Sequence, residues 1–119
     1  MKIAVPSIGA NVCQHFGHCE NFRLFEAEDE NIVTETSIPN PGHRPGYLPN
    51  FLADLGVKLV IAGGLGGGAA QIFEERNVEI VAGATGNARV AVERYLKGEL
   101  KSTGEICHEH EAKKRGENC

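Results

Sequence analysis

The sequence predicts a single α/β domain built around a mixed β-sheet. Three observations lead to this fold class. In the first half of the chain, short β-branched runs alternate between apolar and polar residues, as antiparallel strands do. In the second half, a continuous apolar run, a glycine-containing turn and an amphipathic helix occur twice in succession, which is typical of parallel strands joined by right-handed crossovers. The chain of 119 residues is long enough for one such domain with its own core.

The first half predicts a strand followed by a hairpin. Residues 2–6 form a short apolar run that ends at a proline and a serine. Residues 21–27 alternate between the two faces of a strand, with Phe22 and Leu24 on the same face. The β-branched run 32–38 follows across a polar turn, and the proline at its end suits an edge strand.

The second half predicts two βα units after a first short helix. That helix begins near Leu48, has its apolar residues at helical spacing and ends at Gly56. Asn87 or Thr85 is the expected N-cap of the last helix. The two expected parallel strands cover residues 57–62 and 78–82, and the helices that follow them begin near residues 69 and 88.

We expect the first strand to lie in the centre of a five-stranded sheet. The expected spatial order is third, second, first, fourth, fifth. This order places the loop after the first strand and the loop after the fourth strand at the same sheet edge, where ligands of open α/β sheets usually bind. It also predicts that Ile3 and Val5 are buried between layers.

The loop after the first strand concentrates side chains that bind soft and borderline metals. Its sequence, Cys13-Gln-His-Phe-Gly-His-Cys19, holds two thiols and two imidazoles within seven residues. Gly17 permits the curl that would bring both sulfurs to one metal. We therefore expect Cys13, His15, His18 and Cys19 to be metal ligands. A buried structural role for each cysteine, or a redox pair formed by the two, is the alternative.

Residues 101–119 form a polar tail, which we expect to be mobile and separate from a domain of residues 1–100. The tail contains Cys107, His108 and Cys119. Core burial is the weakest explanation for cysteines in such a segment. Cys107 and His108 are therefore expected as further metal ligands, ranked behind those of the first loop.

The glycine-rich turn Gly63-Gly-Leu-Gly-Gly-Gly68 fits nucleotide-binding motifs only in part. Dinucleotide binding expects an acidic residue at the end of the next strand, and none is present there. Ala69-Ala70 stands where a P-loop requires Lys followed by Ser or Thr. The turn therefore indicates a helix N-terminus that favours an anion, or simply close packing of strand and helix.

Composition and motifs argue against several function classes. The net charge is −4 and no basic stripe is present, so we expect no nucleic-acid partner. No apolar run is long enough to span a membrane, and the chain starts with a strand candidate instead of a signal-peptide pattern, so we expect a cytoplasmic location. Ser7 lacks a nucleophile-elbow frame, and the central strands offer only Glu79 as a carboxylate. A non-catalytic binding function is therefore expected instead of an enzyme.

Several motifs taken together resemble the dinitrogenase iron–molybdenum cofactor biosynthesis family, which comprises nitrogenase-cofactor carrier and accessory proteins. The resemblance extends over roughly residues 1–100. The motifs that carry it are Met1-Lys-Ile-Ala-Val-Pro6, His15-Phe-Gly-His18 with Phe22 following, Gly56-Val57, Val60-Ile-Ala-Gly-Gly-Leu-Gly66 and Tyr95-Leu-Lys-Gly-Glu-Leu100.

The resemblance implies a three-layer, ribonuclease-H-like fold without nuclease activity. It also implies binding of an iron–sulfur or iron–molybdenum type cluster by a carrier or accessory protein related to nitrogen fixation. A P-loop ATPase or a cluster-assembly protein is the partner that it implies. The implied site is lined by His15, Gly64, Gly66, Gly67 and Gly68.

Two other functions stay open on the sequence. One is a zinc-binding or thiol redox module that uses Cys13 and Cys19. The other is an adaptor that binds a P-loop ATPase through its tail.

Overall fold

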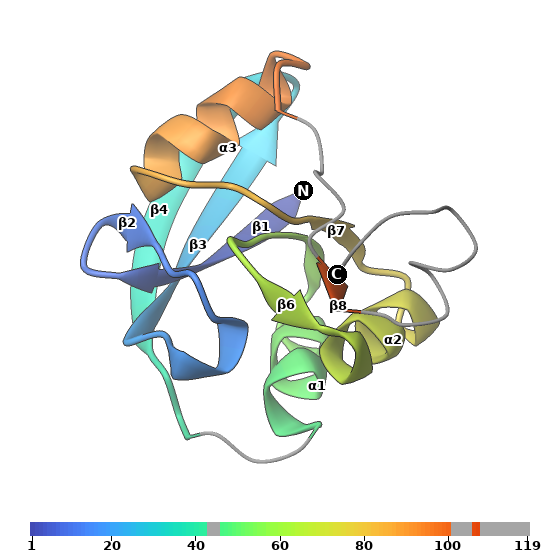
Figure 1. The fold of residues 1–119 in the computed structure, drawn as a ribbon. Coiled ribbons are helices and arrows are strands. Elements are labelled where there is room, and N and C mark those ends of the chain that lie inside the picture. Colours follow the sequence, from blue (N-terminus) through green and yellow to red (C-terminus); the bar gives the residue numbers. More distant parts are fainter. Residues whose placement is uncertain (43–45, 101–105, 108–119) are drawn as a thin grey trace.

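The computed structural model describes residues 1–42 and 46–100, together with the backbone of residues 106–107. Its main sheet is mixed and runs in the order β4-β3-β1-β5-β7, with β2 paired to β1 outside this path (Figure 1). The strands of this sheet are β1 (Lys2–Ile8), β2 (Asn11–Val12), β3 (Asn21–Glu28), β4 (Asn31–Pro39), β5 (Val57–Ile61) and β7 (Glu79–Val81). A second, parallel sheet consists of β6 (Leu65–Gly66) and β8 (Ile106–Cys107).

The expected count of five strands is wrong, because the loop after β1 contributes a sixth. Gly9 adopts a φ of 61°, which turns the chain so that Asn11–Val12 pairs back onto Ser7 and Ile8. β1 also extends two residues beyond the expected end. Pro6 is tolerated within it because the parallel pairing of β1 with β5 already ends at Ala4, so its missing N–H removes no bond of that ladder.

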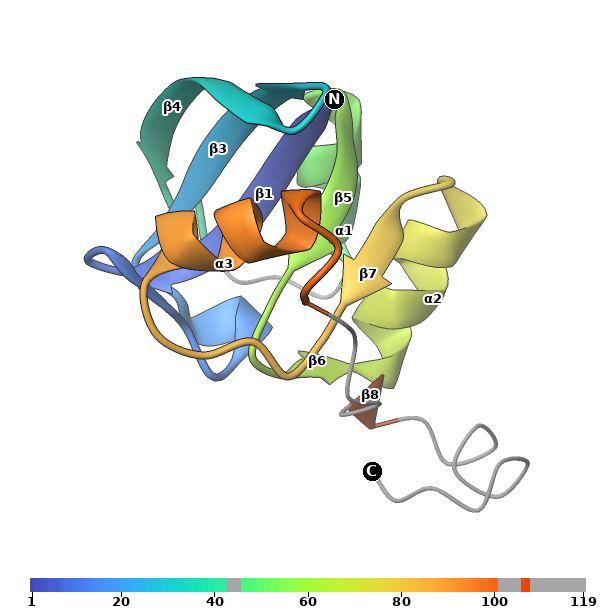
Figure 2. The ribbon, with the colours of Figure 1, turned by 90° about the horizontal axis from the view of Figure 1, so that it is seen from above.

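Helices cover both faces of the sheet and give a three-layer arrangement (Figure 2). α1 (Tyr47–Asp54) and α2 (Gly67–Glu75) lie on one face, and α3 (Ala88–Leu96) lies on the other. A one-turn 3-10 helix, η1 (Phe16–His18), lies within the loop after β2. None of the helices in the described ranges is long and apolar enough to cross a membrane.

Each face of the sheet has its own apolar core. The core under α1 and α2 includes Ala4, Phe22, Leu52, Val60 and Phe73. The core under α3 includes Ile3, Val5, Phe25, Leu59 and Val92. Because β1 lies between β3 and β5, it contributes side chains to both cores, and Ile3 and Val5 are fully buried as expected.

The helix boundaries follow local sequence signals. Leu55 ends α1 and Gly56 follows at a φ of 92°, which confirms the expected glycine stop. Asn87, and not Thr85, caps α3, because its side chain accepts the Val90 N–H at 3.0 Å. α2 begins at Gly67, two residues before the expected start, with Gly66 in an extended conformation as its N-cap.

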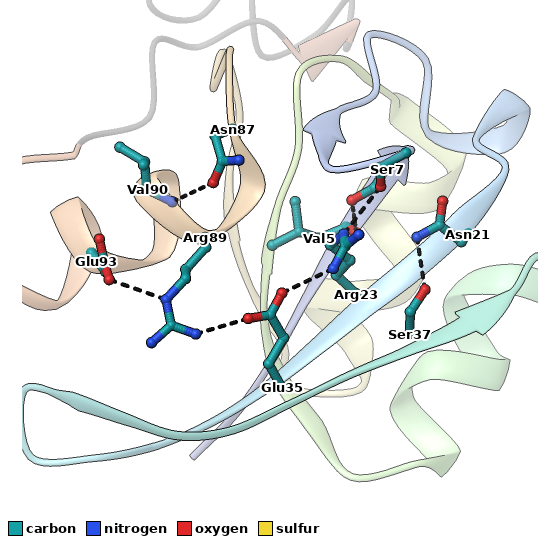
Figure 3. A network of polar contacts seen from close by, with 11 residues as sticks. Val5, Ser7, Asn21, Arg23, Glu35, Ser37, Asn87, Arg89, Val90 and Glu93 are labelled. Carbon is teal, nitrogen blue, oxygen red and sulfur yellow. Dashed lines mark hydrogen bonds and ion pairs between the residues drawn. The ribbon is translucent and has the colours of Figure 1, made fainter.

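An ion-pair network holds α3 against the hairpin of β3 and β4 (Figure 3). Glu35 on β4 lies between two guanidinium groups, at 2.9 Å from Arg23 on β3 and 2.8 Å from Arg89 on α3. Arg23 also donates through Nε to the carbonyl of Gly9 at 3.0 Å. The network thus connects the last helix, the edge strand and the turn between β1 and β2.

The domain boundary expected at residue 100 falls next to residues that the structure does not describe. In the tail, only the backbone of Ile106 and Cys107 is described, and it pairs with Leu65 and Gly66. The expectation of a mobile tail otherwise lies outside the described residues.

The central position of β1 predicts a large difference between two Asp substitutions. Ile3→Asp places an unpaired carboxylate in the core under α3 and should lower the free energy of unfolding by on the order of 5 kcal/mol, enough to unfold many domains. Val33→Asp is the matched control, because Val33 is 54% exposed on edge strand β4, and it should change stability by less than about 0.5 kcal/mol. Urea unfolding followed by circular dichroism measures both. Equal stability of the two variants would contradict the burial of β1.

Candidate metal-binding site

Three loops meet at one edge of the sheet, beyond the carboxyl ends of β1, β5 and β7. The Gly63 N–H donates to the Cys13 carbonyl at 3.3 Å, and the Phe16 N–H donates to the Gly64 carbonyl at 3.1 Å. The loop after β7 joins them, since the Gly83 N–H donates to the Gly63 carbonyl at 2.9 Å. These bonds confirm the expectation that the Cys/His loop and the glycine loop leave the same sheet edge and flank one region.

Both ends of the Cys/His loop are hydrogen-bonded to β1. At one end the Cys13 N–H donates to the Pro6 carbonyl at 2.8 Å, and at the other the Glu20 N–H donates to the Ser7 carbonyl at 2.9 Å. Both ends of the loop are therefore fixed to adjacent residues of the same strand. The six residues from Gln14 to Cys19, which include η1, lie between these anchors.

Gly63 and Gly64 are required by the close approach of the two loops. A Cβ on Gly63 would lie 2.7 Å from the Cys13 carbonyl oxygen, and one on Gly64 would lie 2.6 Å from the Gln14 carbonyl oxygen. Both contacts are with backbone atoms that cannot rotate away. A Cβ on Gly66 or Gly68 would meet nothing within 4 Å. The close approach of the loops therefore requires Gly63 and Gly64 but not Gly66 or Gly68.

Both thiols of the loop point into the core. Cys13 is 3% exposed and Cys19 is 5% exposed, and both belong to the apolar cluster under α1 and α2. The Cys13 thiol donates to the His15 carbonyl at 3.1 Å. Phe16 packs beside them, edge-on to Phe73 with ring centroids 5.6 Å apart. The cysteines are thus packed residues in this conformation, as the alternative of a buried structural role supposed, and they are close enough to interact electrostatically.

Burial, and to a smaller extent the nearby Cys13, raises the pKa of the Cys19 thiol to about 11, although hydrogen bonds from Ser7, from its own backbone and from Asn40 act in the opposite direction. Cys19 is therefore protonated at neutral pH. Since a metal binds the thiolate, metal binding at Cys19 has to displace this proton.

The two imidazoles lie on the outside of the same loop. His15 and His18 are exposed at the two ends of η1, with ring centroids 6.1 Å apart. Across the described ranges, no three His, Cys, Asp or Glu side chains form a group able to hold a metal ion. The structure therefore brings together the two thiols on the inside and the two imidazoles on the outside, but not all four in one shell.

The tail returns to this edge of the sheet at one point. The backbone of Cys107 is paired in parallel with Gly66, at the start of α2. His108, the other expected tail ligand, lies outside the described residues.

Asn40 is a residue of this site that sequence reasoning missed. Its side-chain amide donates to the Cys19 carbonyl at 2.9 Å and to the Cys19 sulfur at 3.6 Å. The only local signal is its position between Pro39 and Pro41, which marks a stiff segment but not a contact 21 residues away in the sequence.

Residues 1–98 match the family described as dinitrogenase iron-molybdenum cofactor. The chain belongs to this family. The matched range contains the Cys/His loop and the glycine loop, whereas Cys107 and Cys119 follow after its end. The two tail cysteines are therefore additions to the part of the chain that the family defines.

Relatives of this dinitrogenase cofactor family member share most of its length. The chain is 27% identical over 106 residues to the uncharacterized protein MJ0580 of Methanocaldococcus jannaschii, covering 85% of this chain and 90% of that protein. It is 29% identical to PH0822, whose crystal structure matches with a TM-score of 0.81 over 88% of this chain and 96% of that one. The apo form of the orange protein from Desulfovibrio gigas, at 20% identity, shares the fold with a TM-score of 0.75 over 87% of this chain and 93% of that one.

The close approach of the loops predicts different effects for two neighbouring glycines. Gly64→Ala should force Gln14 and the thiol loop to shift and should cost about 1–3 kcal/mol of stability. Gly66→Ala is the control, because its Cβ meets open space. The readouts are urea unfolding and the alkylation rate of Cys13 and Cys19 under native conditions, which should rise in Gly64→Ala only. If Gly64→Ala behaves like Gly66→Ala in both assays, the loops do not pack as described.

Proposed function

We propose that this protein is a non-catalytic carrier or accessory protein for a metal–sulfur cluster of the iron–sulfur or iron–molybdenum type. The cluster is its cargo, received and released at the loop of residues 13–19. The observation that carries the proposal is the pair of neighbouring thiols, Cys13 and Cys19, at the sheet edge where three loops meet. Membership of the dinitrogenase iron-molybdenum cofactor family supports it.

The donor chemistry of the loop fits such a cargo. Thiolates are the usual ligands of iron–sulfur clusters, and imidazole can replace some of them. Cys13 and Cys19 supply the sulfur ligands after Phe16 and the rest of η1 move aside from them, and His15 and His18 already lie on the outer side. The start of α2, at Gly66, Gly67 and Gly68, presents backbone N–H groups that favour a negatively charged cluster.

The hidden thiols also suit transient binding. A permanent metal site has its ligands gathered and oriented, which stabilises the fold with the metal bound. Here the loop packs its own cysteines into the core, and the metal has to compete with that packing and with the proton on Cys19. Part of the gross binding free energy is lost in this competition, which weakens net affinity and favours release to an acceptor.

The neighbouring thiols also support a second candidate, a zinc-binding or thiol redox module. Anaerobic purification followed by metal and sulfide analysis separates the two. Iron and acid-labile sulfide with visible absorption support the cluster carrier. Stoichiometric zinc without visible absorption, or a protein whose thiols only cycle between reduced and oxidised forms, would overturn it in favour of the module.

The proposed ligands predict unequal losses of cluster retention. Cys13→Ser and Cys19→Ser, reconstituted with iron and sulfide, should each retain the cluster at least about 100-fold less well, because losing a ligand costs more than losing one of its hydrogen-bond partners. Both variants should stay folded by circular dichroism. Truncation after residue 104 removes Cys107 and Cys119 and should weaken retention less.

The truncated chain can also contradict the assignment of the site to the loop of residues 13–19. If it loses all binding while both serine variants bind like the wild type, the site belongs to the tail. In that case the loop of residues 13–19 has only a structural function.

A further inference from the structure

We propose that Asn40 is a positioning residue that orients the Cys19 sulfur for cluster binding and donates a hydrogen bond to it in the loaded state. Asn40 lies after β4, outside the Cys/His loop and outside every motif noted in the sequence. The inference rests on the proposed function, in which Cys19 is a ligand, and adds a residue that controls this ligand.

One amide group holds both the backbone and the side chain of Cys19. Asn40 Nδ2 lies 2.9 Å from the Cys19 carbonyl oxygen and 3.6 Å from the Cys19 sulfur. The longer second distance suits a sulfur acceptor, which is larger than oxygen. Because one group binds the carbonyl and the sulfur, it restricts rotation about the Cα–Cβ bond between them, which decides where the sulfur points.

The orientation of the Asn40 amide is itself determined by its neighbours. Its Oδ1 accepts the Gly42 N–H at 2.9 Å, which leaves the NH2 group for Cys19. In the reverse orientation, Asn40 Oδ1 would face another acceptor, the Cys19 carbonyl oxygen. Asn40 Nδ2 would face another donor, the Gly42 N–H. The Asn40 N–H also donates to the Glu20 carbonyl at 3.0 Å, so the backbone is tied to the residue after Cys19.

The segment that carries Asn40 is stiff. Pro39 fixes its own φ, and Pro41 restricts Asn40 to extended conformations. A donor held this way does not have to be ordered when the sulfur changes from thiol to ligand. Outer contacts of this kind orient metal ligands and alter the properties of the metal that they hold.

The chemistry of the residue agrees with this function. A neutral NH2 group donates to a sulfur whether it is a thiol or a metal-bound thiolate, whereas a carboxylate at this position would repel the thiolate. Hydrogen bonds to cluster sulfurs draw charge from them and are one of the factors that set the reduction potential. Removing the donor should therefore make the potential more negative.

The test compares Asn40→Ala with Asn21→Ala as a matched control. Asn21 is also an asparagine of the β3–β4 hairpin region whose amide donates a hydrogen bond, at 2.9 Å to Ser37 Oγ, but that bond does not involve a thiol. Two probes are used on the full chain. Cadmium(II) is titrated by its sulfur-to-metal charge-transfer absorption, and a cluster reconstituted from iron and sulfide is examined by protein-film voltammetry.

We expect Asn40→Ala to bind cadmium roughly 10- to 100-fold more weakly than the wild type, as is typical for the loss of an outer hydrogen-bond partner. We also expect its charge-transfer band and its cluster potential to shift, the potential to a more negative value. Asn21→Ala should match the wild type in all three measurements. A residue with only a structural function would lower thermal stability without moving the band or the potential.

The inference is overturned if band and potential are unchanged in Asn40→Ala, or if Cys19→Ser binds cadmium like the wild type, since Cys19 is then no ligand. The cadmium arm also separates this inference from the proposed function. If the wild type takes up cadmium through Cys19 but holds no iron–sulfur cluster, the carrier function fails, while the effect of Asn40 on the sulfur is still measured.

Discussion

The candidate site depends on the close contact between the backbone of Cys13–Gln14 and that of Gly63–Gly64. With a Cβ on either glycine the two loops could not approach, and the bonds between Gly63 and Cys13 and between Gly64 and Phe16 would be lost. The contact in turn requires β1 and β5 to be parallel neighbours, because only then do both loops leave the same edge. The sheet order, the glycines and the position of the thiols are therefore consequences of one another.

The contact also explains why the site combines packing and chemistry in the same few residues. Phe16 belongs to the core and is bonded to the glycine loop through its backbone, while the residues on either side of it carry the thiols and imidazoles. A change in the Cys/His loop therefore affects the core under α1 and α2, and a change in that core affects the packing around the two thiols. If the loop binds a cluster as proposed, stability and cargo binding are opposed properties of one segment.

Much of the fold could be predicted from the sequence, because it depends on patterns within single elements. The alternation of Phe22, Leu24 and Phe25 across β3, the apolar run of β5 and the cap at Asn87 were all visible locally. The sixth strand was missed because Asn11–Val12 is too short to show a period and depends on the turn at Gly9. The candidate site was inferred from residue types alone, and its ligands stay a prediction. Residue types do not reveal burial, so the inward packing of Cys13 and Cys19, and the reach of Asn40 across the hairpin to the sulfur, required the three-dimensional structure.

The attachment of both ends of the Cys/His loop to β1 has a further consequence. Cys13 is one end of this loop and Cys19 precedes the other end, Glu20; the two ends are hydrogen-bonded to Pro6 and Ser7, which are adjacent on a central strand. These bonds hold Cys13 and the residue after Cys19 at fixed places on one strand. In the function proposed above, the pair would therefore act as a chelator: once one sulfur has bound a metal atom, the second is already at a high effective concentration beside it. The rest of the ligand shell can then vary, or be supplied by the molecule that delivers the metal, without loss of the first attachment.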